Sequence, residues 1–204
     1  MNATLTNLAG FRLMLASQSP RRKELLQHLG LEVFTVTPIE TDESFPPGLT
    51  GDETALHIAE QKAEANRSLI GEQDILITAD TLVYLKGQVL GKPADREDAL
   101  RMLRLLSGNQ HQVFTGVCLT SLNERRSFVA RTDVTFSQLT EEEMSWYVDH
   151  YHPYDKAGAY GIQEWIGAVA VERITGSYFN VMGLPVHLLY EQLKCFPVAN
   201  RTAY

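Results

Sequence analysis

The sequence predicts an α/β fold in which helices flank a mixed, strongly curved central sheet. Apolar runs of strand length recur along the chain, and amphipathic segments of helix length separate many of them. The two kinds of segment do not alternate strictly, so we do not expect a purely parallel sheet. Two long strand patterns, residues 113–119 and 127–136, are joined through Asn123, Glu124 and Arg125, which predicts an antiparallel ribbon that extends the sheet.

The first quarter of the chain predicts two strands and a helix. We expect residues 1–10 to form a loose end. Residues 13–16 are an apolar run typical of a strand, and residues 20–29 carry leucines on one helical face. Residues 31–36 alternate apolar and polar side chains, which predicts a second strand. The turn-rich residues 38–52 predict a long loop.

The middle of the chain predicts a long helix, a buried strand and a hairpin. Residues 53–70 keep alanines and an isoleucine at helical spacing. Residues 75–79 are fully apolar and predict a strand that ends at Asp80. Residues 82–85 and 89–90 flank a Lys-Gly pair, which is typical of a hairpin turn.

The last half of the chain predicts three helices and a final strand. An acidic N-cap starts a helix over residues 95–106, and a capping box at Thr140 starts another. Residues 168–174 predict the last strand, and residues 185–193 predict a closing helix.

Composition limits the function classes. The 204 residues are enough for a single domain over 1–204, and 44% hydrophobic content is ordinary for a globular protein. A net charge of −7 argues against binding a nucleic acid polymer through a general basic surface, but not against a small phosphorylated ligand. Because no membrane-length apolar run and no signal-peptide pattern is present, we expect a cytoplasmic protein without membrane contact. Cys118 and Cys195 lie in apolar surroundings, so we expect buried free thiols.

A basic turn at the start of the first predicted helix is the most informative local feature. Ser19 is a good N-cap, and Pro20 fits the first helical position. Arg21, Arg22 and Lys23 follow where the helix dipole already places positive charge, so they repel it unless an anion is bound. Arginines and free N–H groups at a helix start form a phosphate site. A solvated basic turn explains the same charges equally well.

Two further charged residues lie beside apolar segments. Lys62 is on or next to the inward stripe of its helix, so its ammonium either passes the core edge to solvent, which is the commoner outcome, or points into a site. Asp80 directly follows an apolar strand. We favour a site at a strand end over a simple turn cap for this carboxylate, with Lys92 shortly beyond it.

The cationic and acidic candidates together fit phosphoryl chemistry. Cations hold phosphate oxygens, carboxylates hold Mg²⁺ or Mn²⁺, and one carboxylate can deprotonate water. A P-loop, a G-x-G-x-x-G loop, a zinc-ligand spacing and a nucleophile elbow are all absent from the sequence, and the six histidines have no metal spacing. The candidates are Arg21, Arg22, Lys62, Lys92 and Lys156 as cations, with Glu40 and Asp80 as acids.

Several short motifs then follow one another over residues 12–194. They are Ala16-Ser17-Gln18-Ser19-Pro20-Arg21-Arg22, Ala79-Asp80-Thr81, Gly91-Lys92-Pro93, Leu106-Ser107-Gly108 with His111, and Asp155-Lys156-Ala157-Gly158-Ala159-Tyr160-Gly161-Ile162-Gln163. In this combination the chain resembles the Maf family of nucleoside triphosphate pyrophosphatases. The last motif resembles the branch that acts on dTTP and UTP, whereas the sister branch prefers 7-methyl-GTP.

The resemblance implies a fold, an activity and a set of site residues. The fold is inosine triphosphatase-like and Maf-like, with two lobes around a cleft. The activity is hydrolysis of dTTP and UTP to the monophosphate and diphosphate, which prevents incorporation of non-standard nucleotides. Asp80 is then the proton acceptor and, with Glu40, a ligand of Mg²⁺ or Mn²⁺, although Asp42 or Glu43 could replace Glu40. The implied substrate-binding residues are Ser17, Arg21, Arg22, Lys62 and Lys92, with Lys156 as a further candidate, and those for base choice are Arg21, Thr81 and Gln163.

The chemistry of Gln163 agrees with a base-reading role. A Gln amide can donate to a pyrimidine O4 and accept from N3–H at once. Guanine presents a similar edge, so pocket size must exclude purines. One alternative is the same reaction on a modified pyrimidine nucleotide or on a modified purine such as 7-methyl-GTP. Two others are a nucleotide-binding regulator of cell division that acts through a protein partner, and a structural domain without a ligand. The family also suggests a homodimer.

Overall fold

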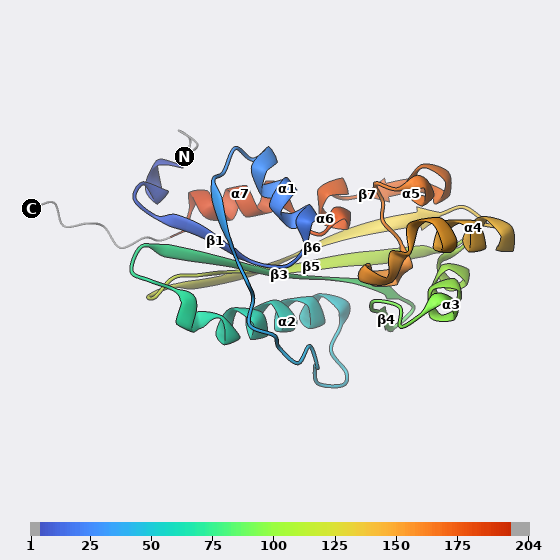
Figure 1. Cartoon of the computed structure of the whole chain (residues 1–204), viewed down its shortest axis with the longest axis horizontal. Coiled ribbons are helices and arrows are strands. Elements are labelled where there is room, and N and C mark those ends of the chain that lie inside the picture. Colours follow the sequence, from blue (N-terminus) through green and yellow to red (C-terminus); the bar gives the residue numbers. More distant parts are fainter. Residues whose placement is uncertain (1–4, 197–204) are drawn as a thin grey trace, which may run out of the picture.

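The structure is a computed structural model that describes residues 5–196 (Figure 1). Within these residues the strands form one mixed sheet in the order β2-β1-β3-β5-β6-β7, and β4 pairs with β3. β1 is parallel to β2 and β3, whereas the other pairings are antiparallel, so the predicted mixed α/β fold is confirmed. The strands are β1 Arg12–Ala16, β2 Val33–Val36, β3 Asp74–Leu85, β4 Gln88–Leu90, β5 Gln110–Thr120, β6 Arg125–Phe136 and β7 Val171–Thr175.

Helices cover both faces of the sheet. Figure 1 shows α1, α6 and α7 on one face and α2 on the other, with α3, α4 and α5 gathered at the far end of the long strands. The helices are α1 Pro20–His28, α2 Gly51–Ala65, α3 Arg96–Leu106, α4 Glu141–Tyr151, α5 Trp165–Ala170, α6 Tyr178–Met182 and α7 Val186–Lys194, and the short 3-10 turns are η1 Thr6–Leu8, η2 Arg67–Leu69, η3 Pro153–Asp155 and η4 Ala157–Ala159. None of the helices in the described range is long and apolar enough to span a bilayer.

Two large hydrophobic clusters occupy opposite ends of β3 and β5. One includes Leu15, Ile77 and Leu189, and joins β1, α1 and α7 to the sheet. The other includes Leu103 and Tyr147, and joins α3, α4 and α5 to the sheet. Because β3 and β5 contribute residues to both clusters, the two lobes expected from the sequence share one continuous sheet.

β3 differs from the sequence prediction in a way that matters for the site. The predicted strand end at Asp80 was wrong, since β3 continues to Leu85. Antiparallel pairing with β5, from Leu76↔Thr120 to Tyr84↔Gln112, carries the backbone through the two polar residues. Asp80 and Thr81 therefore lie in the middle of a rigid strand.

Other predicted boundaries shift at chain turns. The helix predicted over 53–70 ends at Ala65, because Asn66 leaves helical geometry and its amide donates to Lys62 O at 2.8 Å. The strand predicted over 168–174 begins at Val171, because α5 occupies residues 165–170 first.

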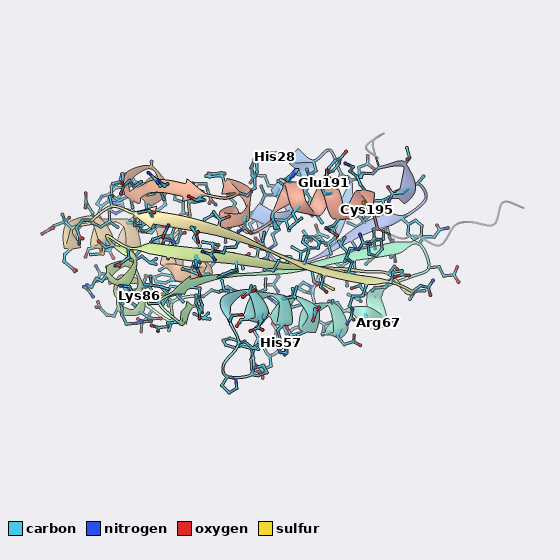
Figure 2. The ribbon with its side chains drawn as sticks, turned by 180° about the vertical axis from the view of Figure 1, so that it is seen from behind. His28, His57, Arg67, Lys86, Glu191 and Cys195 are labelled. Atoms are coloured by element: carbon cyan, nitrogen blue, oxygen red, sulfur yellow. The ribbon has the colours of Figure 1, made fainter. Side chains whose placement is uncertain are left out.

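Two expectations about the chain ends were also wrong. Leu5 and Leu8 are buried, and Asn7 Nδ2 donates to Leu193 O at 2.9 Å, so this part of the predicted loose end packs on α7; residues 1–4 lie outside the described range. Cys118 is buried as predicted, but Cys195 is exposed at the end of α7 (Figure 2). It lies beyond Leu193, the last residue of this helix that faces the core.

Candidate active site

A gap in strand pairing along one edge of β3 creates the site. β1 pairs with β3 only as far as Leu15↔Ile77, and β4 begins at Val83↔Leu90. Within the described chain, residues 78–82 thus have no strand partner on this edge, while β5 holds their other edge. A cleft of about 500 Å³ lies here and includes Asp80 and Thr81. The predicted position at the end of the strand that carries Asp80 was wrong, because the cleft lies beside the middle of β3, where β1 ends.

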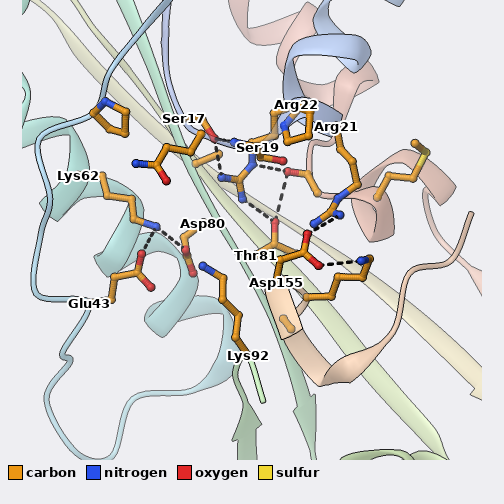
Figure 3. Close-up of a pocket in the computed structure, with 18 of the residues that line it drawn as sticks. Ser17, Ser19, Arg21, Arg22, Glu43, Lys62, Asp80, Thr81, Lys92 and Asp155 are labelled. Atoms are coloured by element: carbon orange, nitrogen blue, oxygen red, sulfur yellow. Dashed lines mark hydrogen bonds and ion pairs between the residues drawn. The ribbon is translucent and has the colours of Figure 1, made fainter. Parts of the chain in front are cut away.

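The cleft brings together all the residues that the sequence predicted for the site. Arg21 lines the same cavity as Asp80, although they come from different elements, and Figure 3 shows Lys92 pointing toward Asp80. The full predicted set that lines it is Ser17, Arg21, Arg22, Glu40, Lys62, Asp80, Thr81, Lys92, Lys156 and Gln163.

The basic turn divides between the cleft and the surface. β1 ends at Ala16, and Ser19 is the extended N-cap residue of α1, with no capping hydrogen bond from its side chain to the described helix. Arg21 and Arg22 both line the cleft, whereas Lys23 faces outward. The two arginines are therefore not part of a purely solvated turn, since they lie in the cleft beside the N-terminus of α1.

Arg22 ties three elements together beneath the cleft. Its guanidinium donates from Nε to Gly183 O at 2.9 Å and from Nη2 to Thr81 Oγ1 at 3.1 Å. Nη1 also lies 3.4 Å from Ser17 Oγ. Burial lowers the pKa of Arg22 below its ordinary value, and the charge of Asp80 opposes this effect. Arg22 remains charged at neutral pH and fixes α1 against β3.

A glycine on β5 lets α2 approach the sheet closely. Gly116 is the register partner of Asp80, and a Cβ at Gly116 would lie 2.2 Å from Ala55 O of α2. Thr78 Oγ1 also donates to Ala59 O at 2.8 Å. These contacts set the position of Lys62, which follows one turn later on α2, relative to Asp80.

Lys62 points into the cleft and contacts two acids. Its Nζ lies 2.7 Å from Asp80 Oδ1 and 2.8 Å from Glu43 Oε1. The side chains of Lys62 and Asp80 are only 17% and 14% exposed, so the pair is held largely away from solvent. Burial raises the pKa of Glu43, but the hydrogen bond and charge of Lys62, with the charges of Lys92 and Arg22, outweigh it and hold that pKa below its ordinary value.

The acidic loop places its three carboxylates differently. Glu43 contacts Lys62, and Glu40 lines the cleft. Asp42 instead accepts hydrogen bonds from the backbone and side chain of Ser44 at 3.1 and 3.0 Å. The sequence left the choice among these acids open, because a loop has no periodicity from which to infer which side chain faces inward.

The segment from Asp155 to Gln163 forms the opposite wall. Gln163 is exposed and lines the cleft, which suits a residue that contacts a ligand. Asp155 Oδ2 accepts from Arg21 Nη1 at 3.1 Å, and Lys156 Nζ lies 2.7 Å from Asp155 Oδ1 and 3.1 Å from Glu164 Oε1. Sequence reasoning missed Glu164, and no local pattern marks it.

The fold and the cleft define a class of protein. Cationic side chains and the start of a helix surround a cavity in which a lysine holds a carboxylate, so this is a phosphate-binding α/β protein equipped for acid–base chemistry. The described residues hold no group of three or more His, Cys, Asp or Glu that could by itself bind a metal ion. Figure 2 shows His28 and His57 on opposite sides of the sheet.

The chain belongs to the Maf family: the model described as Maf-like protein matches residues 12–196. A Bacteroides fragilis protein named dTTP/UTP pyrophosphatase is 56% identical over 93% of this chain and 98% of its own. A Porphyromonas gingivalis protein of the same name is 51% identical over 96% of this chain and all of its own. A solved structure of a HAM1 protein from Coxiella burnetii aligns with 63% of this chain and 74% of its own, at 16% identity and a TM-score of 0.42.

Proposed function

We propose that this protein is a nucleoside triphosphate pyrophosphatase that hydrolyses dTTP and UTP to the monophosphate and pyrophosphate. The observation that carries the proposal is that Arg21, Arg22 and Lys92 line one cleft together with Asp80. The names of the Bacteroides and Porphyromonas relatives support the same activity and the same bases.

The phosphates bind at the start of α1 and along its basic residues. Ser17, Arg21 and Lys92 offer a hydroxyl, a guanidinium and an ammonium to phosphate oxygens. The first N–H groups of α1 add partial positive charge. Arg22 contributes its charge from below, because three of its nitrogens already contact protein oxygens.

Asp80 accepts the proton of the attacking water. Its Oδ1 accepts from Lys62, which leaves the second carboxylate oxygen to take the proton. The water oxygen forms a bond to the α-phosphorus, the bond from that phosphorus to the bridging oxygen breaks, and pyrophosphate leaves with the bridging oxygen. The hydrogen bond from Lys62 orients the Asp80 carboxylate for this role.

The acids of the cleft fit a divalent cation. Asp80 and Glu43 both contact one ammonium, so their oxygens already converge on a cationic position, and Glu40 lines the same cavity. Mg²⁺ or Mn²⁺ prefers a few carboxylates completed by substrate phosphates, so the lack of a closed cluster in the described chain fits this arrangement. Such an ion supplies charge neutralisation on the phosphates.

Base choice falls to the opposite wall. The Gln163 amide can read O4 and N3–H of uracil or thymine, and its exposure in the cleft supports this role. Arg21 and Thr81 stand near the same cavity, and Thr81 is fixed through Arg22. We further propose a cytoplasmic protein, acting as a homodimer on free nucleotides to keep non-standard ones out of nucleic acid.

A metal-dependent activity screen tests the proposal. The purified protein is incubated with dTTP, UTP, the other standard triphosphates and 7-methyl-GTP, with and without Mg²⁺ or Mn²⁺, and pyrophosphate is measured. We expect dTTP and UTP to be the best substrates and Asp80→Asn to lower kcat by about 10²–10⁴-fold with the fold retained. Retention of most activity by Asp80→Asn refutes its role, and preference for 7-methyl-GTP refutes the base assignment.

A further inference from the structure

The Lys156 side chain is largely buried and contacts carboxylates of the protein itself. Its side chain is 9% exposed, and its ammonium contacts the carboxylates of both Asp155 and Glu164. Two adjacent negative charges more than balance one positive charge, so this lysine offers little net attraction to a phosphate. Burial raises the pKa of Asp155, but the hydrogen bond and charge of Lys156, with Arg21, outweigh it and keep that pKa below its ordinary value.

Glu164 is also held from the core side. The buried Tyr147 hydroxyl of α4 donates to Glu164 Oε2 and accepts from Gly161 N at 3.1 Å. Burial, then the hydrogen bond and charge of Glu164, raise the pKa of Tyr147, so this hydroxyl stays a donor at neutral pH. A Cβ on Gly161 would lie 2.7 Å from Glu164 Cδ, so the Glu164 carboxylate lies directly against this turn.

The chain on the other side of Gln163 is anchored as firmly. Tyr160 donates to or accepts from His111 Nε2 at 2.8 Å, and its ring packs against Phe136 with centroids 4.9 Å apart. Gly158 and Ala159 both adopt left-handed backbone angles, with φ of 69° and 59°. A non-glycine residue in this region is strained, so surrounding contacts must hold it there.

Gln163 is thus an exposed side chain between two fixed points. Tyr160 anchors the backbone before it, and Glu164 anchors the backbone after it. We propose that Tyr147, Glu164 and Lys156 are positioning residues that hold Gln163 in the cleft and thereby set which base the protein accepts. This inference rests on the proposed function, and it assigns Lys156 to the loop and not to the phosphates.

Steady-state kinetics of Tyr147→Phe test the inference. The variant keeps the buried ring and removes the hydroxyl that links Glu164 to Gly161. We expect KM for dTTP and UTP to rise about tenfold while kcat changes less than about threefold, because a base contact is weakened and the reacting atoms are not. Inorganic triphosphate carries no base, so its inhibition constant should change less than about twofold.

Tyr151→Phe is the matched control on the same helix. Tyr151 is 38% exposed, and its loss of a hydroxyl should leave KM unchanged. A merely structural role for Tyr147 predicts a lower active fraction, and so a lower kcat for every nucleotide with an unchanged KM; that result overturns the proposal. An equal KM for Tyr147→Phe and Tyr151→Phe also overturns it.

A second variant covers the case in which Tyr147→Phe does not fold. Glu164→Gln keeps the shape of the side chain and removes its charge toward Lys156, and should give the same rise in KM with kcat retained. Failure of the unmodified protein to hydrolyse dTTP and UTP refutes the proposed function instead. In that case the dissociation constant for dTTP is measured by calorimetry in place of KM. We expect it to rise about tenfold in Tyr147→Phe, and equal dissociation constants for Tyr147→Phe and Tyr151→Phe overturn the inference.

Discussion

Replacement of Lys62 by methionine separates its structural role from its role in the site. The change keeps the length of the side chain and removes the ammonium that Asp80 and Glu43 share at 2.7 and 2.8 Å. Two carboxylates then face each other across a position that holds no positive charge. The folded protein should lose stability, and the acids should become available to another cation.

The expected magnitude follows from exposure. Removal of one partner from a buried ion pair costs about 3–5 kcal/mol, whereas an exposed pair contributes about 0.2–1 kcal/mol. Lys62 and Asp80 are mostly buried, and Glu43 is 49% exposed, so the free energy of unfolding should fall by about 2 kcal/mol. For a chain of this length that corresponds to a melting temperature lower by about 4–8 °C.

Thermal unfolding in EDTA and in Mg²⁺ measures both effects. Mg²⁺ should raise the melting temperature of Lys62→Met more than that of the unmodified protein, because it binds the two unpaired carboxylates of the folded state. Lys194→Met is the control, since it removes an exposed lysine that pairs with Glu191 at 2.9 Å. A Lys62→Met melting temperature within about 1 °C of that control in EDTA, or a Mg²⁺-induced rise no larger than that of the unmodified protein, would refute the reasoning.

Three further changes give distinct expected results. Gly116→Ala places a Cβ 2.2 Å from Ala55 O, so α2 must shift, and kcat should fall about tenfold or more; an unchanged kcat contradicts this. Burial lowers the pKa of His111 to about 4, so acidification from pH 6.5 protonates the unfolded chain first and favours unfolding. Between about pH 7 and pH 4.5, denaturant titrations should show a loss of stability about 2 kcal/mol larger in the unmodified protein than in His111→Gln, and equal losses contradict this. Arg21→Ala should raise KM about tenfold and the surface change Arg125→Ala should not, so equal effects count against the phosphate site.

Local sequence patterns identified the residues of the cleft, but they did not identify the strand pairing that brings these residues together. Helical spacing placed Lys62 near the inward face of its helix, and the charge conflict at the start of α1 marked Arg21 and Arg22. Asp80 stood out as a carboxylate beside an apolar run. The same pattern wrongly ended the strand there, because only the pairing of β3 with β5 shows that the backbone continues.

Contacts between distant segments account for what the sequence did not predict. Lys156 carries a charge that suits a phosphate, but its neighbours are decided by how residues 155–164 fold back on themselves. Tyr147 looks like an ordinary inward residue of an amphipathic helix, and nothing local indicates that its hydroxyl meets Glu164. The close approach of α2 to the sheet at Gly116 likewise depends on how the two elements pack, and the local sequence does not indicate it.

The first hydrophobic cluster also constrains how the chain folds during synthesis. Leu5 and Leu13 near the start are covered by Leu189 and Leu193 of α7 near the end. A nascent chain on the ribosome therefore cannot complete this cluster until its last helix has emerged, and the apolar face of β1 stays open until then. The apolar side chains of this cluster that are made first are therefore among the last to be covered.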